Sequence, residues 1–177
     1  MPIAEQTAVV THPTPLGDLT LAASDEAVYY CGFASPEEVR RRLGAGADGS
    51  DGADGAGETG GALLKEARGQ LDAYLDGRLF AFSLPVDLGL ASDFVRRTVT
   101  ALAELTGYGQ TRTYGELAAR IDRAGAARAV GTALGANPLC VIEPCHRILP
   151  ASGRIGGYAG GSTAKEFLLR LEASHRL

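Results

Sequence analysis

One segment, residues 44–61, limits what the rest of this chain can fold into. It consists almost wholly of glycine, alanine, aspartate and serine. Such a composition buries too little apolar surface to offset the conformational entropy that is lost on ordering. We therefore expect a disordered surface loop there, and a fold built from the residues on either side of it.

The segment before the loop predicts strands and one short helix. Two runs that favour strands, 19–23 and 27–33, are separated by a polar turn and predict a β-hairpin. Residues 36–43 have a helical pattern with three arginines in the last turn, where they complement the helix dipole.

After the loop, helical spacing resumes over residues 63–75, and Gly77 is placed to end that helix. Residues 80–88 predict a short edge strand or the start of a connector, because Pro85 lies among them. We place the end of a first domain here, at residue 88, and expect a second domain over residues 92–177.

The second domain begins with a helical pattern. Ser92 can cap a helix whose apolar side chains recur at i, i+4 and i+7, namely Val95, Val99 and Leu102. Thr113 and Glu116 have the spacing of a capping box, which opens a short helix through Ile121. A tight turn leads to another short helix over 126–134, with Gly135 placed to end it. Two short helices joined by a tight turn predict a helix-turn-helix.

The second of these short helices carries one large polar residue, Arg128, among small ones. Ala126, Ala127, Ala129 and Gly131 would let its backbone approach another surface closely. Close packing inside the core is one interpretation, and the arginine favours the other, a contact with nucleic acid.

Charge is divided unequally along the chain. The net charge is −4, but residues 1–90 carry 6 basic and 14 acidic side chains, whereas residues 91–177 carry 11 basic and 7 acidic ones. A basic second half suits a nucleic-acid partner, and it is equally compatible with a solvated surface.

Residues 137–150, around Cys145, contain the largest group of potentially reactive side chains. Cysteine attacks as the thiolate, and an ordinary thiol is mostly protonated at neutral pH. His146 and Arg147 follow directly and could activate it. Neighbours in a strand point to opposite faces, so Cys145 and His146 need a turn or a water molecule to communicate. Pro144 indicates such an irregular, rigid backbone.

A third member of this group lies far downstream. Thr163 and Glu166 have capping-box spacing and predict a helix through about residue 173, whose buried stripe is flanked by Glu172. A buried carboxylate needs a partner. Pairing with His146 would give Cys–His–Glu, in which Glu172 favours the protonated imidazole and thereby the thiolate. Alternatively, Glu172 reaches solvent or pairs with Arg176.

Between the cysteine and this helix, residues 152–161 form a glycine-rich loop. Its spacing is not that of a phosphate-binding loop. The glycines could let the backbone fold against a flat ligand, with Tyr158 as an aromatic wall. A plain surface loop is the alternative.

Taken together, these motifs resemble the O6-alkylguanine-DNA alkyltransferases. The sequence Pro-Cys-His-Arg at 144–147 is similar to the active-site signature of that family. It is preceded by Asn-Pro at 137–138 and followed by Gly-Tyr-Ala-Gly-Gly at 157–161. Residues 114–118 and 126–131 resemble the helix-turn-helix of the family. Several motifs in the expected order make the match specific.

The resemblance implies an α/β fold class: a small, ribonuclease-H-like N-terminal domain and a mainly helical C-terminal domain that carries the site. It also implies repair of O6-alkylguanine, and less so of O4-alkylthymine, by irreversible transfer of the alkyl group to Cys145. His146 and Glu172 would draw off the thiol proton through water. Each molecule would act once, without a cofactor.

By the same resemblance, the second helix of the helix-turn-helix enters the minor groove of double-stranded DNA. Arg128 would fill the gap left by the flipped nucleotide, and Tyr114 would assist its rotation. Ala126, Ala127, Ala129 and Gly131 would lie against the DNA. The flipped base would bind among Tyr114, Asn137, Ile148, Tyr158 and Ala159.

Some positions depart from the family pattern. Glu143 stands where an apolar residue is usual, and its charge is expected to raise the pKa of Cys145 unless it faces solvent. Cys140 replaces a common proline, and Thr100 stands where a tryptophan is frequent. His12 and Cys31 are too isolated to predict a zinc site.

Two other functions fit part of the sequence: a non-enzymatic relative that binds alkylated DNA, and a cysteine hydrolase. The first does not require Cys145, and the second leaves the helix-turn-helix unexplained. A simple helix-turn-helix regulator would leave the reactive cysteine unexplained. Without a signal peptide, a spanning segment or a disulfide framework, we expect a monomer in a reducing cytoplasm, with no membrane contact.

Overall fold

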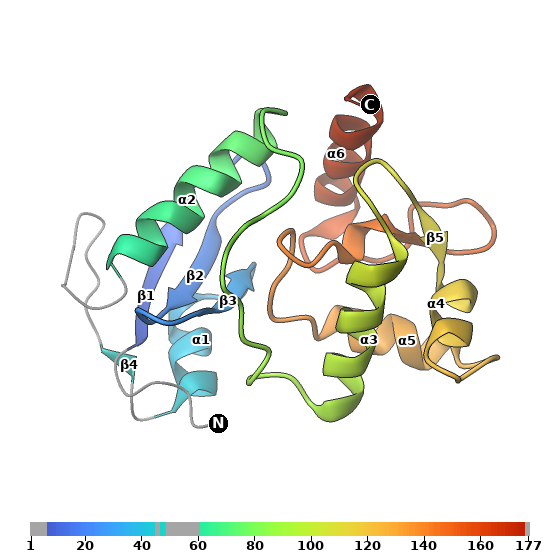
Figure 1. The fold of residues 1–177 in the computed structure, drawn as a ribbon, viewed down its shortest axis with the longest axis horizontal. Helices are drawn as coiled ribbons and strands as arrows, with labels where there is room; N and C mark the ends of the chain where they lie inside the picture. Colours follow the sequence, from blue (N-terminus) through green and yellow to red (C-terminus); the bar gives the residue numbers. More distant parts are fainter. Residues whose placement is uncertain (1–6, 45–46, 49–60, 176–177) are drawn as a thin grey trace. The chain divides into compact units, whose positions relative to one another are not determined.

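The computed structural model divides the chain into two units, Met1–Leu90 and Ala91–Leu177 (Figure 1). It describes residues 7–44, 47–48 and 61–175. The first unit combines a sheet with two helices, and the second is mainly helical, so the predicted α/β fold class is confirmed. None of the helices among the described residues is long and apolar enough to cross a membrane.

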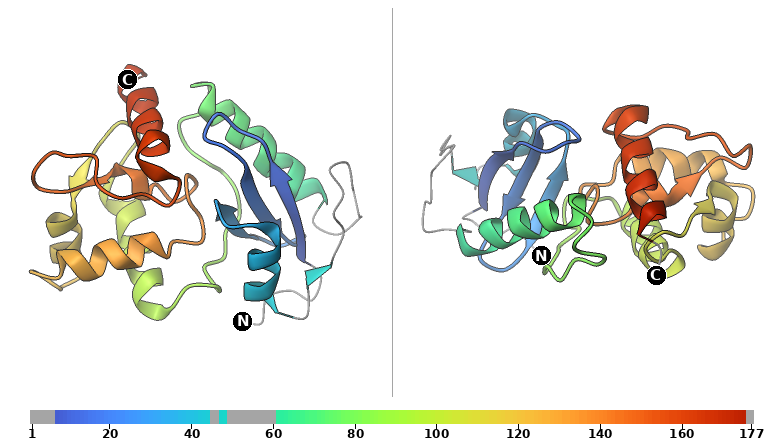
Figure 2. Two further views of the ribbon diagram at one scale, coloured as in Figure 1. Left: turned by 180° about the vertical axis from the view of Figure 1, so that it is seen from behind. Right: turned by 90° about the horizontal axis from the view of Figure 1, so that it is seen from above.

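The first unit is built on a four-stranded sheet with the order β3-β2-β1-β4. Its strands are β1 (Thr7–His12), β2 (Leu19–Ala23), β3 (Val28–Gly32) and β4 (Ala47–Asp48). The predicted hairpin is the antiparallel pair β2–β3. Helix α1 (Pro36–Leu43) covers one face of the sheet and α2 (Gly61–Leu75) the other (Figures 1 and 2). Covering both faces explains why every residue of β2 and β3 is buried.

The pairing of β1, β2 and β3 places apolar side chains in a row beneath α1. Val9 pairs with Ala22, and Ala22 pairs with Tyr30, so these three side chains form one row across the sheet. Val39 of α1 packs against this row and is fully buried. Because side chains alternate along a strand, the neighbouring residues point to the other face, where α2 lies.

Two predictions for this unit can be compared with the structure. Of the two possibilities for residues 80–88, the connector is present and the edge strand is not: a single bridge joins Val28 and Val86, and Pro85 has no N–H to extend a ladder. The predicted loop, 44–61, lies mostly outside the described residues. Two of its residues instead form β4, which pairs in parallel with β1, and Gly61 already belongs to α2.

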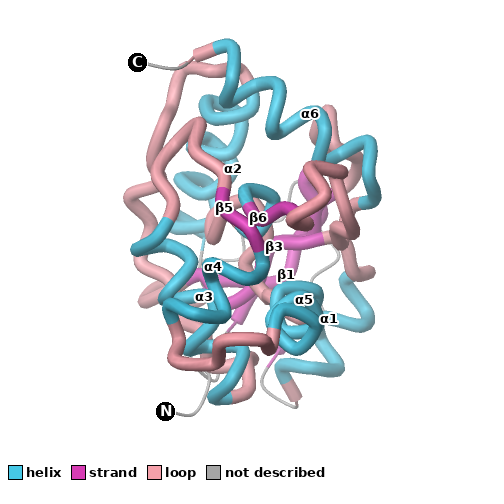
Figure 3. The backbone as a smooth tube through the Cα atoms, turned by 90° about the vertical axis from the view of Figure 1, so that its right-hand side faces the viewer, coloured by secondary structure: helices cyan, strands magenta, loops and turns pink. Residues whose placement is uncertain are grey.

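In the second unit, a short parallel strand pair lies between α6 and the other helices (Figure 3). The elements are α3 (Asp93–Leu105), β5 (Arg112–Thr113), α4 (Tyr114–Arg120), α5 (Ala127–Gly135), a 3₁₀ helix (Cys145–Arg147), β6 (Ile148–Leu149) and α6 (Gly161–Ser174). Ser92 caps α3, and both hydrogen bonds of the predicted capping box at Thr113 and Glu116 are present.

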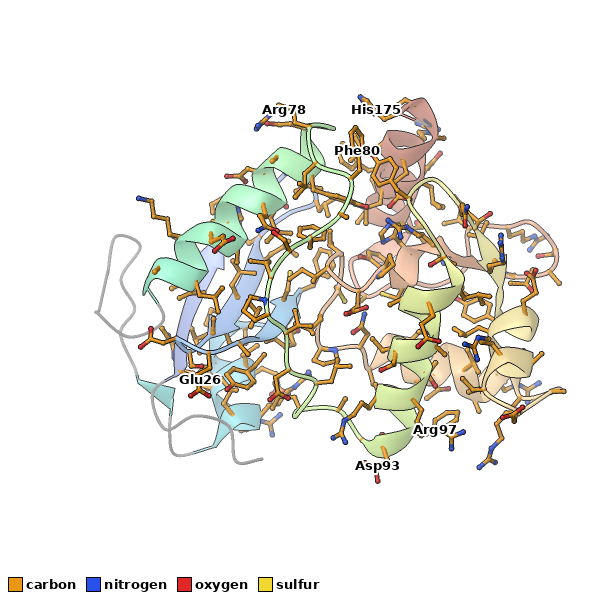
Figure 4. All side chains as sticks on the ribbon, in the orientation of Figure 1. Glu26, Arg78, Phe80, Asp93, Arg97 and His175 are labelled. Atoms are coloured by element: carbon orange, nitrogen blue, oxygen red, sulfur yellow. The ribbon has the colours of Figure 1, made fainter. Side chains whose placement is uncertain are left out.

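Helices α4 and α5 form the predicted pair with a tight turn. The turn contains two residues with positive φ, Asp122 at 57° and Gly125 at 85°. Arg97 on α3, labelled in Figure 4, donates a hydrogen bond of 3.4 Å to the carbonyl of Ile121 at the end of α4. Helix α3 thereby supports the pair.

The predicted start of α6 was wrong. Helix α6 begins at Gly161 with no side-chain cap, so Thr163 lies within its first turn. The reason is the preceding turn, in which the N–H of Gly161 donates to the carbonyl of Tyr158 and leads directly into the helix. Helix α5 ends at Gly135, as expected, and Ala136 is its cap.

Candidate active site

The 3₁₀ helix Cys145–Arg147 separates three reactive side chains. Cys145 donates its N–H to the carbonyl of Glu143 at 2.8 Å, and Arg147 to that of Pro144 at 3.0 Å. With three residues per turn, successive side chains point in different directions. This is the turn that the sequence required for Cys145 and His146 to act together.

Asn137 closes the loop in front of this turn. Its Oδ1 accepts a hydrogen bond of 3.0 Å from the N–H of Leu139, and its Nδ2 donates at 3.2 Å to the carbonyl of Glu143. Within the loop, Val141 has a φ of 73°, a conformation that β-branched residues rarely adopt. The backbone here is irregular and tightly bonded, as predicted.

Glu172 of α6 contacts the reactive turn, residues 145–147, through the side chains of His146 and Arg147. Its Oε1 lies 2.6 Å from His146 Nε2, and Arg147 Nε donates to both oxygens, at 3.1 and 2.9 Å. The N–H of Gly109 donates to Oε2 at 2.8 Å. Glu172 is only 2% exposed, so it is a buried carboxylate held by these side-chain and backbone donors. The alternative partner, Arg176, lies outside the described residues.

The protonation of His146 differs from the expectation. Burial lowers the pKa of His146, and the hydrogen bond that Glu172 accepts from it opposes this only in part. The imidazole is therefore neutral near pH 7, with Nε2–H directed at the carboxylate and the lone pair on Nδ1. His146 is placed to accept a proton and does not supply a standing positive charge to the thiolate.

Other groups favour the thiolate of Cys145. The pKa of Cys145 is lowered mainly by a hydrogen bond from Cys140, against the opposing effect of burial. Asn137 and the charge of Lys165 lower it further. Glu143 is not among these groups, and burial raises the pKa of Glu143 itself, so the expected effect of its charge on Cys145 is not seen.

Lys165 is a site residue whose role the sequence analysis missed. It is fully buried, and Nζ donates to the carbonyls of Ile148 at 2.7 Å and Gly157 at 3.2 Å. Burial lowers the pKa of Lys165 to about 8. The sequence spacing could have predicted this position. Lys165 and Glu172 are seven residues apart, which is two turns of one helix, so both side chains face the reactive turn.

A pocket of about 270 Å³ opens over the thiol. Cys145, Tyr114, Tyr158 and Ala159, which the sequence analysis assigned to the site, line it together with Gly131, Leu134, Gly135 and Gly157. Asn137 and Ile148 are not among its lining residues; they support the turn and Lys165. Tyr114 and Tyr158 provide aromatic surface at the pocket.

The loop before α6 depends on Gly156. It has a φ of 74°, and a Cβ there would lie 2.9 Å from the ring of Pro150. Only glycine permits this approach, which keeps the loop folded back towards Lys165 and the pocket. The glycine-rich loop therefore forms one wall of the site.

The small-residue helix α5 has an outer and an inner side. Arg128 and Ala129 are exposed, and Ala126 and Ala127 are partly buried at its start. Gly131 lines the pocket, where a Cβ would lie 3.6 Å from the ring of Tyr114. Among the described residues, no cluster of three or more His, Cys, Asp or Glu side chains could hold a metal ion.

Comparison with protein families gives two matches that together span most of the chain. Residues 10–88 match the ribonuclease-like domain of 6-O-methylguanine DNA methyltransferase, and residues 93–174 match its DNA-binding domain.

Among curated proteins, a methylated-DNA–protein-cysteine methyltransferase of Mycolicibacterium paratuberculosis is 49% identical over 60% of this chain. That alignment spans 63% of the mycobacterial protein, and thus less than two thirds of its length. The protein of the same name from Methanosarcina acetivorans is 37% identical over 91% of this chain and 95% of its own length.

Solved structures give the same result. The O6-methylguanine methyltransferase of Mycobacterium tuberculosis superposes with a TM-score of 0.77 at 35% identity, covering 97% of this chain and 95% of that one. A structure of the M. tuberculosis protein in complex with DNA gives a TM-score of 0.76 at 37% identity, covering 95% and 94% of the two chains.

Proposed function

Because this chain belongs to the 6-O-methylguanine DNA methyltransferase family, we propose that it repairs DNA by moving an alkyl group from O6 of guanine to Cys145. The observation that carries the proposal is the position of Cys145, whose thiol has a lowered pKa and lines a pocket with two tyrosines. A flat base can enter such a pocket with its substituent directed at the sulfur.

The reaction is a direct displacement. The thiol proton passes through water to Nδ1 of His146, whose other nitrogen is held by Glu172. Sγ then forms a bond to the alkyl carbon while the bond from that carbon to O6 breaks, and guanine leaves with the electron pair and takes up a proton. Burial raises the pKa of Tyr114, so its hydroxyl stays protonated and can donate to the departing base.

Duplex DNA would bind along α4 and α5. The exposed Arg128 projects from a helix start made of small residues, which suits insertion into the minor groove beside a flipped nucleotide. The structure of a similar M. tuberculosis protein with DNA supports a DNA partner. O4-alkylthymine would be a poorer substrate.

The product thioether cannot be exchanged as a disulfide can, so each molecule would act once. The three cysteines are buried and form no disulfide, which suits a monomer working in a reducing cytoplasm. The presence of Cys145 argues against a purely binding relative, and one-time use distinguishes the proposal from a hydrolase.

The test is incubation with excess duplex oligonucleotide that contains O6-methylguanine, followed by intact and peptide mass measurement. We expect one methyl group per molecule, on Cys145, and a burst of one repaired base per protein. The Cys145→Ser variant should bind the DNA and gain no methyl. Repeated turnover would contradict the proposal and support a hydrolase.

A further inference from the structure

The exposed arginines of the second unit differ in what holds their side chains. Four of those that the structure describes bond to the protein itself, three to carboxylates and one to a backbone carbonyl: Arg96, Arg97, Arg120 and Arg170. The other three, Arg123, Arg128 and Arg154, make no hydrogen bond or ion pair with any described residue. Exposed cations without a partner in their own chain are available to an anionic ligand.

The sequence around these three arginines is almost free of acidic residues. Residues 123–165 contain five basic side chains and a single acidic one, Glu143. Helix α5 and the glycine-rich loop, residues 152–161, both lie within this stretch, and both line the pocket over Cys145. The elements around the pocket therefore carry an excess of positive charge, which suits a polyanion.

The three arginines lie on two different elements of the pocket. Arg123 and Arg128 lie on either side of the start of α5, the helix proposed to meet DNA. Arg154 lies in the loop between β6 and α6, whose residues 157–159 line the pocket. Figures 1 and 2 show this loop, drawn in orange, on the same side of the second unit as β5 and α4. A duplex that lies along α4 and α5 with one base in the pocket therefore passes the loop as well.

The backbone holds Arg154 at a defined place in this loop. On one side, the N–H of Gly153 donates to the carbonyl of Pro150 at 3.0 Å, in a turn where Gly153 has a φ of 75°. On the other side, Gly156 packs so closely against the ring of Pro150 that a Cβ would lie 2.9 Å from it. The side chain of Arg154 itself is exposed. An anchored backbone loses little conformational entropy when the exposed side chain binds a ligand.

The chemistry of a flipped nucleotide calls for a cation at this position. The nucleotide that enters the pocket has a phosphate on each side, and its strand has to stay distorted while the alkyl group is transferred. Arg123 and Arg128 can contact that strand only from α5. A guanidinium on the loop can donate two parallel hydrogen bonds to a phosphate and hold the strand from the other element of the pocket.

We propose that Arg154 binds a backbone phosphate of the damaged strand, so that α5 and the glycine-rich loop together hold that strand around the flipped nucleotide. This contact rests on the proposed function, because it requires duplex DNA that delivers a base to Cys145. It adds a DNA-binding residue outside the helix-turn-helix. The alternative, a solvated surface arginine, would leave DNA binding unchanged.

The salt dependence of binding tests the contact. The probe is a fluorescent duplex with one O6-methylguanine, and every protein carries Cys145→Ser so that the base is not consumed. Arg154→Gln removes the charge, Arg154→Lys keeps it, and the control Arg170→Gln removes an exposed charge from α6. The plot of log affinity against log salt should become shallower by about 0.9 in Arg154→Gln, the contribution of one phosphate. The slope should not change in Arg154→Lys or Arg170→Gln, and an unchanged slope in Arg154→Gln would overturn the proposal.

Uncharged linkages then locate the phosphate. In a series of duplexes, one phosphate at a time near the methylated guanine is replaced by a methylphosphonate. One such replacement in the damaged strand should weaken binding when Arg154 is present and have little further effect in Arg154→Gln, as expected for two groups in direct contact. If no linkage of the damaged strand shows this coupling, the contact does not exist, even where Arg154→Gln binds more weakly.

Transfer rates distinguish the contact from a role in the fold. With Cys145 restored, Arg154→Gln should lose more rate on duplex DNA than on free O6-methylguanine base. Equal losses on both would overturn the proposal and show that Arg154 supports the loop. If the protein with Cys145 accepts no methyl group from either substrate, the proposed function fails. The salt slope and the uncharged linkages still decide whether Arg154 binds a phosphate, because neither measurement depends on transfer.

Discussion

At the scale of single residues, the side chains that lower the pKa of Cys145 are not its sequence neighbours. His146 and Arg147 follow it directly, yet His146 is neutral and Arg147 is bound to Glu172. The donors that favour the thiolate are Cys140 and Asn137, with Lys165 as the nearby cation. In the proposed reaction, His146 is therefore the proton acceptor and not a counter-ion.

The pair His146 and Glu172 gives a prediction for catalysis. His146→Gln and Glu172→Gln should both slow alkyl transfer at neutral pH, because no neutral imidazole is held ready to take the thiol proton. Raising the pH towards that of an ordinary thiol should restore much of the rate in both variants. If both still bind DNA and neither is rescued at high pH, the proton relay is wrong.

The two variants should differ in stability. Glu172→Gln leaves the buried Arg147 without its charged partner, which typically costs about 3–5 kcal/mol of the free energy of unfolding. His146→Gln keeps the bond between Arg147 and Glu172 and should cost clearly less. Denaturant unfolding of both variants separates the structural effect from the kinetic one.

At the scale of elements, α6 brings two charges to the reactive turn. Lys165 and Glu172 lie on its inner face, one bonded to Ile148 after the turn and the other to residues within it. The outer face carries the exposed Arg170. The helix thus supplies the buried charges that the short 3₁₀ segment cannot hold in place by itself.

Helix α5 gives a prediction for repair. If Arg128 fills the gap left by a flipped base, as proposed, Arg128→Ala should slow repair of duplex DNA by about tenfold or more. The reaction with free O6-methylguanine base should change little, since it needs no flipping. Arg170→Ala, an exposed arginine on α6, is the control and should leave both reactions unchanged. Equal losses of Arg128→Ala on both substrates would instead indicate a role in the fold.

At the scale of the whole molecule, the net charge of −4 is unequally distributed, and the second half of the chain is basic. Residues 91–177 carry 11 basic and 7 acidic side chains. Electrostatic attraction to phosphates falls off within about 10 Å at moderate salt, so the local charge decides DNA binding and the total charge does not.

A pair of charge reversals tests this. Arg123→Glu, in the exposed turn between α4 and α5, and Arg78→Glu, an exposed residue of the first unit labelled in Figure 4, change the net charge equally. Only Arg123→Glu should weaken duplex binding and make the affinity less dependent on salt, as measured by fluorescence anisotropy. Equal effects of the two variants would show that the total charge governs binding.

Much of this protein follows from its sequence. The caps at Ser92 and Thr113, the hairpin and the helix pair were predicted correctly, because each depends on hydrogen bonds and periodicity within a few residues. The chemistry proposed around Cys145 was inferred from residue types and order. The family pattern then indicated which distant segments belong together.

Only the tertiary structure decided the rest. Residues 80–88 form a connector and no strand, and α6 has its N-cap position three residues before the predicted cap at Thr163, because neighbouring segments and turns override local preference. The contacts of Glu172 with His146, of Lys165 with Ile148, and of Cys140 with Cys145 join side chains that the chain order does not place together. A pKa depends on burial and on every charge nearby, so the neutral His146 and the favoured thiolate of Cys145 arise only once the fold has formed.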